Sequence, residues 1–148
     1  MLLGFKTVSA FFMPGSDSYM VLWKAVCVCL IDYIIAYTVL GLGGIFRNKI
    51  KNPSVSLCVG SIFALSLRYI AHIISGFIFF GTWADWFFSQ DGFTLGAKIL
   101  EKFSGQGLAF LYSVIYNGLY MIPEIIITAI VALIIGRVPQ ISGRKNTK

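Results

Sequence analysis

Three long apolar runs, broken only by single polar positions, dominate the pattern of hydrophobic and polar residues. They cover residues 20–46, 54–80 and 108–136. A helix of about 20 apolar residues is long enough to cross the hydrocarbon core of a bilayer. Each run reaches that length, so the pattern predicts an all-α integral membrane bundle with three full spans in a single membrane domain.

A fourth apolar stretch, residues 1–13, is too short to span a bilayer as a helix. Lys6 interrupts it, and no A-x-A-like cleavage site follows, which disfavours a signal peptide. We interpret it as a remnant helix, the end of a span that begins earlier, or as a re-entrant piece.

The segments between the runs indicate the orientation in the membrane. A basic loop at residues 47–53 and a basic tail at residues 137–148 are separated by two spans, so both lie on one side. The positive-inside rule places that side, and therefore the C-terminus, in the cytoplasm. The longer segment 81–107 is then an outer loop. Its apolar residues are of types common at membrane interfaces: Trp83, Trp86, Phe87, Phe88 and Phe93.

Composition supports this prediction and excludes other classes. Of the 148 residues, 57% are hydrophobic and 12% are charged, whereas soluble domains have about 25% charged residues. The net charge of +6 belongs to segments that flank spans, so no nucleic-acid partner is expected. Cys27, Cys29 and Cys58 lie in predicted spans without CxxC spacing and are interpreted as buried small residues; we expect no metal and no cofactor.

Ionisable residues inside spans are costly and are therefore functional candidates. Counted from the outer end of each run at about 1.5 Å per residue, Asp32 and Arg68 lie roughly 18 Å deep and His72 roughly 12 Å. On the third run, Tyr112 and Asn117 lie roughly 6 and 14 Å deep. Residues of three spans therefore share the outer half of the membrane.

Each of these residues also has a simpler structural interpretation. Asp32 and Arg68 could form a buried ion pair that only joins helices. His72 could be a hydrogen bonder between helices. Glu124, which follows Pro123, could satisfy backbone groups that the proline frees.

The combination favours a binding site over these separate interpretations. Arg68 and His72 are spaced i, i+4 and share a helix face, which Gly76 continues and where it could leave space. A carboxylate, a guanidinium, an imidazole, an amide and tyrosines, including Tyr116, would line a pocket open to the outside. Such a pocket suits a small, polar, aromatic and cationic solute.

Three segments resemble the ThiT (YuaJ) family. Asp32-Tyr33 followed by Gly41–Arg47 resembles its acidic-Tyr … LGxxGLFR segment. Arg68–Gly81 is similar to its basic-Y-x-x-H-x-x-x-G-x-x-F helix, and Tyr112–Glu124 to its YSxxYNGxYMxPE signature. The three matches occur in order and at compatible spacing.

The resemblance implies a thiamine-specific S component of an energy-coupling factor transporter, and not an enzyme. Such a subunit binds thiamine from outside the cell membrane, and a transmembrane T component and two cytoplasmic ATPases drive uptake. Phe80 stands where some members have a stacking Trp, a role that Trp83 could take. The positions implied as thiamine-binding are Asp32, Tyr33, Arg68, His72, Gly76, Phe80, Tyr112 and Asn117.

The family normally has six spans, so this chain is expected to correspond to the later part of such a bundle. Two alternatives stay open: an S component or carrier for another small solute, and a structural membrane protein that binds nothing. The sequence contains no HExxH, GxSxG or GxxxxGK[ST] motif, so neither a membrane enzyme nor ATP hydrolysis by this chain is expected.

Overall fold

The structure, a computed structural model, describes residues 18–90 and 93–138. The segment expected to be a remnant helix, residues 1–13, lies outside the described residues, and so does most of the expected tail. The described residues form helices, turns and bends, and contain no strand.

The first long element is a continuous rod made of four helical segments. It begins with α2 (Ser18–Cys29), passes through a π-helical stretch, η1 (Leu30–Ile35), and a short α3 (Ala36–Thr38), and ends in a 3₁₀ stretch, η2 (Val39–Phe46). The chain then turns into α4 (Pro53–Phe80).

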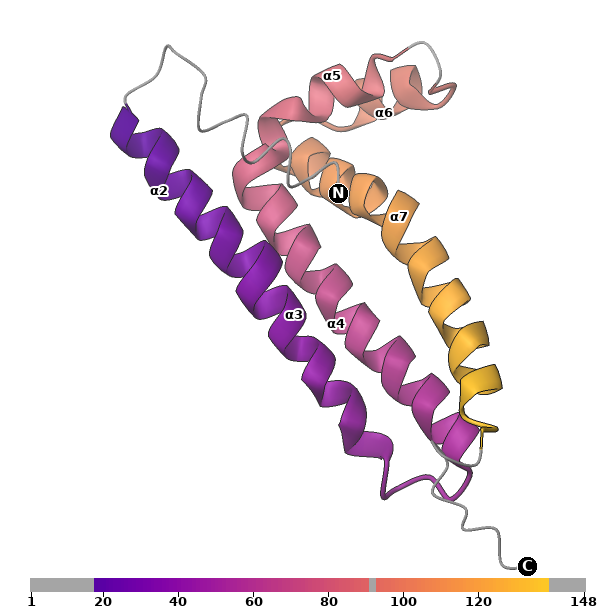
Figure 1. Ribbon diagram of the computed structural model, residues 1–148. Coiled ribbons are helices and arrows are strands. Elements are labelled where there is room, and N and C mark those ends of the chain that lie inside the picture. Colours follow the sequence, from indigo (N-terminus) through magenta and orange to yellow (C-terminus); the bar gives the residue numbers. More distant parts are fainter. Residues whose placement is uncertain (1–17, 91–92, 139–148) are drawn as a thin grey trace, which may run out of the picture.

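The remaining elements follow α4 without a long interruption. A 3₁₀ turn, η3 (Gly81–Trp83), leads into α5 (Ala84–Phe88), and α6 (Gly96–Lys102) precedes the last helix, α7 (Gly105–Ile135). Figure 1 shows α4 between the rod and α7, with α5 and α6 at the end where α4 finishes and α7 begins.

Three helical stretches are long and apolar enough to cross a membrane: Trp23–Phe46, Pro53–Phe88 and Gly105–Ile135. They coincide with the three predicted runs, so the all-α membrane fold is confirmed. The second stretch extends past the predicted end because η3 and α5 continue the helical path. In Figure 1, α5 turns away from the axis of α4.

The start of α4 is set by local chemistry in the basic loop. The side chain of Asn52 accepts hydrogen bonds from the backbone N–H groups of Ser54 and Val55, at 3.0 and 3.4 Å. Pro53 follows as the first helical residue, a position where its missing N–H costs nothing. An Asn cap with a Pro behind it satisfies the exposed end of the helix and fixes its first turn.

Glycines allow the rod to approach α4 closely. A Cβ added to Gly60 would overlap the carbonyl oxygen of Gly43, and one added to Gly43 would lie 3.4 Å from the Cβ of Ala64. Small residues at helix crossings in membranes let backbones meet in this way. The hydroxyl of Ser56 adds a hydrogen bond across the same crossing, to the backbone oxygen of Phe46 at 2.8 Å.

The segment predicted as an outer loop is folded against the bundle. Phe88 is only 1% exposed and packs with Ala84, Leu108 and Tyr112. The interpretation of Phe88 as an interfacial aromatic is therefore wrong, because α5 lays this side chain against the beginning of α7. Trp86 does remain half exposed, as an interfacial residue would.

Candidate ligand-binding site

A buried pair of polar side chains joins the rod to α4. The Asp32 Oδ1 lies 3.0 Å from the His72 Nδ1, and the two residues are 8% and 6% exposed. Asp32 belongs to the π-helical stretch η1, a type of local widening that often occurs at functional sites. The structure thus brings together two predicted site residues from different spans.

The third helix contributes an amide to the same place. The Asn117 Nδ2 donates to the backbone oxygen of His72 at 3.2 Å and to that of Ser113 at 2.8 Å. The hydroxyl of Tyr120 donates to the Asn117 Oδ1 at 2.5 Å, and its ring meets that of His72 edge-on. Asp32, His72, Asn117, Ser113 and Tyr120 form one network, which we call the central polar network.

Gly76 is part of the packing around this network. A Cβ at this position would overlap the Ser113 Oγ and lie 3.0 Å from the Asn117 Nδ2. The Ser113 hydroxyl itself donates to the backbone oxygen of Ile73 at 2.7 Å. In this structure Gly76 therefore makes room for the α7 side chains rather than for open space.

Arg68 pairs with Glu124 and not with Asp32. The Arg68 Nη1 lies 2.6 Å from the Glu124 Oε1, and the guanidinium lies over the ring of Tyr37, 5.0 Å from its centroid. The suggested Asp32–Arg68 ion pair is therefore wrong, because each basic residue meets a carboxylate from a different neighbouring helix. The suggested role of Glu124 at backbone freed by Pro123 is replaced by this ion pair.

Tyr112 and Phe80 belong to a separate aromatic cluster nearer to α5. The ring centroid of Phe87 lies 5.3 Å from that of Tyr112 and 5.8 Å from that of Tyr116. Phe80 packs against the same group. The sequence did not identify Phe87 as a candidate, because it lies in a segment predicted as a loop. Nothing in such a segment indicates which helix an aromatic side chain will pack against.

Tyr33 is a predicted site residue that joins neither the central polar network nor the aromatic cluster. It is 43% exposed, and its ring is stacked in parallel on that of Tyr37, 6.5 Å away. Residues next to each other in a helix point in different directions. Asp32 faces His72, so its neighbour Tyr33 faces outward.

Three buried polar atoms lack a hydrogen-bond partner in the described part of the chain: the His72 Nε2, the Ser75 Oγ and the Arg68 Nε. Such atoms are rare in folded proteins and require an explanation. His72 and Ser75 are spaced i, i+3, so their free atoms lie on neighbouring positions of one helix face. Ser75 is an additional candidate, and its spacing from His72 is the signal that could have found it.

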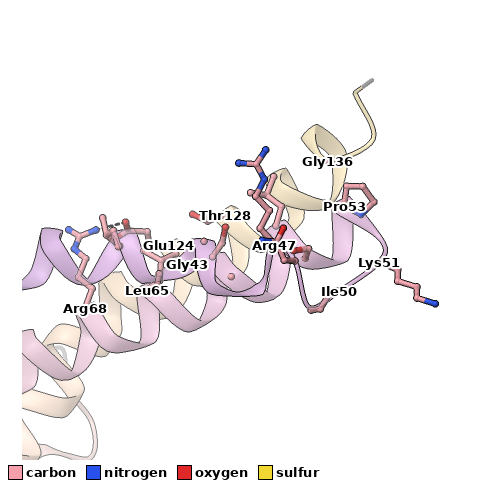
Figure 2. A pocket seen from close by; sticks show the side chains of 18 residues that line it. Gly43, Arg47, Ile50, Lys51, Pro53, Leu65, Arg68, Glu124, Thr128 and Gly136 are labelled. Atoms are coloured by element: carbon pink, nitrogen blue, oxygen red, sulfur yellow. Dashed lines mark hydrogen bonds and ion pairs between the residues drawn. The ribbon is translucent and has the colours of Figure 1, made fainter. Parts of the chain in front are cut away.

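A cavity of about 890 Å³ lies between η2, α4 and α7, on the side of the basic loop. Figure 2 shows Arg68 and Glu124 at one end of it and Lys51 at the other. Asp32, His72 and Asn117 do not line this cavity. The cavity is therefore distinct from the central polar network, and an outward-opening pocket at that network stays a prediction.

Comparison with known proteins gives a matching sequence family. The sequence model of the family described as thiamine transporter protein (Thia_YuaJ) matches residues 12–89. The chain belongs to this family. The resemblance stated from the sequence is thereby confirmed, and the Thia_YuaJ family is one of transport proteins.

A curated relative shows the extent of the similarity. The thiamine transporter ThiT of Bacillus subtilis (strain 168) is 34% identical over an aligned length of 111, and the alignment covers 69% of this chain and 48% of the relative. The chain thus spans about half the length of that relative. No solved structure matches this chain significantly.

Proposed function

We propose that this chain binds thiamine as a substrate-binding subunit of a membrane importer. The observation that carries the proposal is the buried Asp32–His72 pair, 3.0 Å apart and joined through the backbone of His72 to Asn117. Charged and polar groups are expensive inside a span. Their convergence from three helices, in a member of a thiamine transporter family, supports a ligand site rather than simple packing.

The chemistry of thiamine suits these groups. Its thiazolium ring is cationic, which favours a nearby carboxylate such as Asp32 and the faces of aromatic rings. Its aminopyrimidine ring offers donors and acceptors to the free His72 Nε2 and Ser75 Oγ. Tyr112 is five residues from Asn117, roughly 7.5 Å along α7, so two rings joined by one methylene group can reach both the aromatic cluster and the central polar network.

The proposed binding site includes the residues implied by the family resemblance. Asp32, His72 and Asn117 would hold the polar groups of thiamine, and Tyr112 and Phe80 its rings. Arg68, paired with Glu124, would border the site on the side of the basic loop. Gly76 would set the spacing of α4 and α7. Tyr33 would take part only if a further element covered its exposed face.

We further propose that the chain acts as the S component of an energy-coupling factor transporter in the cell membrane. In this role, a transmembrane T component and two cytoplasmic ATPases would supply the energy, and the C-terminus would lie in the cytoplasm. Co-purification of the chain with these subunits, and thiamine uptake that requires all of them, would be the expected results. Uptake that persists without the ATPases would contradict the assignment.

The binding proposal is tested by calorimetric titration of the chain in lipid nanodiscs with thiamine, riboflavin and biotin. Of these three vitamins, only thiamine should bind. Asp32→Asn should weaken its binding by roughly 10- to 100-fold, the value of a lost hydrogen bond to a charged group. Asp85→Asn, the same chemical change at an exposed residue of α5, is the matched control and should leave affinity unchanged.

Each other result points to a different conclusion. Binding of riboflavin or biotin in place of thiamine would support an S component for another solute. No binding of any of the three, with thermal stability lowered by Asp32→Asn, would support a purely structural membrane protein. Equal losses of thiamine affinity in Asp32→Asn and Asp85→Asn would show that the binding site does not lie at the central polar network.

A further inference from the structure

The cavity on the side of the basic loop has an unusual charge balance for a space between spans. Three cationic residues line it, Arg47, Lys51 and Arg68, and Glu124 is the one acidic residue on its lining. Glu124 is already paired with Arg68. Arg47 and Lys51 form no ion pair within residues 18–90 and 93–138, so the cavity carries two uncompensated positive charges.

The position of these two charges matches the level of lipid headgroups. Arg47 directly follows the last residue of η2, and Lys51 lies two residues before the first residue of α4, so both lie where the spans meet water. In Figure 2, Lys51 projects outward from the end of the cavity opposite to Arg68. Deeper along the cavity, leucines provide apolar wall: Leu40, Leu57 and Leu65.

We propose that this cavity binds one anionic phospholipid. The phosphate group would lie near Arg47 and Lys51, and part of an acyl chain would lie along the leucine wall. Basic pockets between spans on the cytoplasmic side are suited to anionic headgroups. A free phosphate ester shares the headgroup chemistry, but only a lipid also has an acyl chain that can pack against the leucine wall.

The bias of basic residues toward one side of a membrane explains loop charge in general, but it does not explain a cavity behind the charge. Substitutions at two glycines of η2 can distinguish a lipid-binding cavity from basic residues that only set the orientation. Gly44 lines the cavity, and a Cβ built there would have no atom within 4 Å; the same is true of a Cβ at Gly41, which does not line the cavity. Gly44→Leu should fill the cavity without removing charge, and Gly41→Leu is its matched control.

The test is native mass spectrometry of the delipidated, detergent-solubilised chain, titrated separately with phosphatidylglycerol and phosphatidylcholine. One phosphatidylglycerol should bind in preference to phosphatidylcholine. The double variant Arg47→Gln/Lys51→Gln should weaken this binding roughly 30-fold, since each basic residue near the surface contributes about 1 kcal/mol. Lys98→Gln/Lys102→Gln, with the same charge change in α6, should have no effect.

Gly44→Leu should lower phosphatidylglycerol binding by at least tenfold, while Gly41→Leu should not. Equal binding of the two lipids, equal losses in the two double variants, or no loss in Gly44→Leu would each overturn the proposal. Displacement of the lipid by equimolar inorganic phosphate or glycerol 3-phosphate would overturn the lipid assignment in favour of a soluble phosphate. None of these outcomes depends on thiamine binding, so this inference can fail while the proposed function stands.

Discussion

At the scale of single residues, the membrane makes the choice of polar partners the main determinant of the site. A charged side chain in the middle of a span costs about 2.5–3.5 kcal/mol on insertion scales. Asp32 meets His72, and Arg68 meets Glu124, so each of these four groups lies beside a partner that can share its charge. Of the three buried polar atoms without a partner, we propose that the His72 Nε2 and the Ser75 Oγ are the ones that a ligand uses.

Gly76→Ala should disturb the central polar network. The added methyl group would overlap the Ser113 Oγ, and overpacking of this kind costs about 1–3 kcal/mol. We expect a lower thermal unfolding temperature in detergent and weaker thiamine binding. Gly41→Ala, where the new Cβ meets nothing within 4 Å, should behave like the unaltered chain; equal effects of the two changes would argue against close packing at Gly76.

Tyr120→Phe tests the hydrogen bond that orients Asn117. Removal of the hydroxyl leaves the buried Asn117 Oδ1 without its donor, at a cost of about 1–3 kcal/mol. Thermal unfolding and thiamine titration should both report the loss. Tyr33→Phe, at an exposed tyrosine outside the network, is the control for thermal unfolding, and an equally large loss of stability there would contradict the buried position of the Tyr120 hydrogen bond.

At the scale of elements, a close crossing of backbones helps to hold the rod against α4, beside the edge-to-face contact of Phe46 and Phe63. Gly43 and Gly60 meet directly, and a Cβ at Gly60 has no space. In a bilayer, where apolar side chains gain little from leaving lipid, such contacts are a main source of helix association. The crossing also fixes the height at which Asp32 faces His72.

Gly60→Leu should therefore separate the rod from α4 and disrupt the Asp32–His72 pair indirectly. We expect the free energy of unfolding to fall by about 1–3 kcal/mol. We also expect a loss of thiamine binding, although Gly60 lies far along α4 from His72. Thermal unfolding and calorimetry would measure both. Gly41→Leu on the rod is the control, and preserved binding in Gly60→Leu would show that the crossing does not set the site.

At the scale of the whole molecule, the bundle has two chemically different ends. One end carries the basic loop, the cavity with Arg47 and Lys51, and the end of α7. The other end carries α5, α6 and the aromatic cluster (Figure 1). The excess of basic residues at the loop end predicts that this end faces the cytoplasm.

Cysteine labelling tests this orientation. With Cys27, Cys29 and Cys58 replaced by Ala, a single cysteine is introduced either at Asn48 or at Ser89, both exposed and at opposite ends. A membrane-impermeant maleimide should label Ser89→Cys in intact cells and label Asn48→Cys only after lysis. The reverse pattern would place the basic loop outside.

Much of the architecture follows from the sequence alone. The three spans are apparent because apolar length by itself decides whether a helix can cross a bilayer. The start of α4 is determined by two neighbouring residues, Asn52 and Pro53. The special positions of Asp32, His72 and Asn117 are also apparent, because polar groups inside a span are costly wherever they lie.

The partners of these residues were decided only by the tertiary structure. The i, i+4 spacing puts Arg68 and His72 on one face, but the rotation and height of the neighbouring helices decide which carboxylate each one meets. The same packing buried Phe88, turned Tyr33 outward and left a cavity behind the basic loop. These features depend on how separate helices fit together, and no single stretch of sequence contains that information.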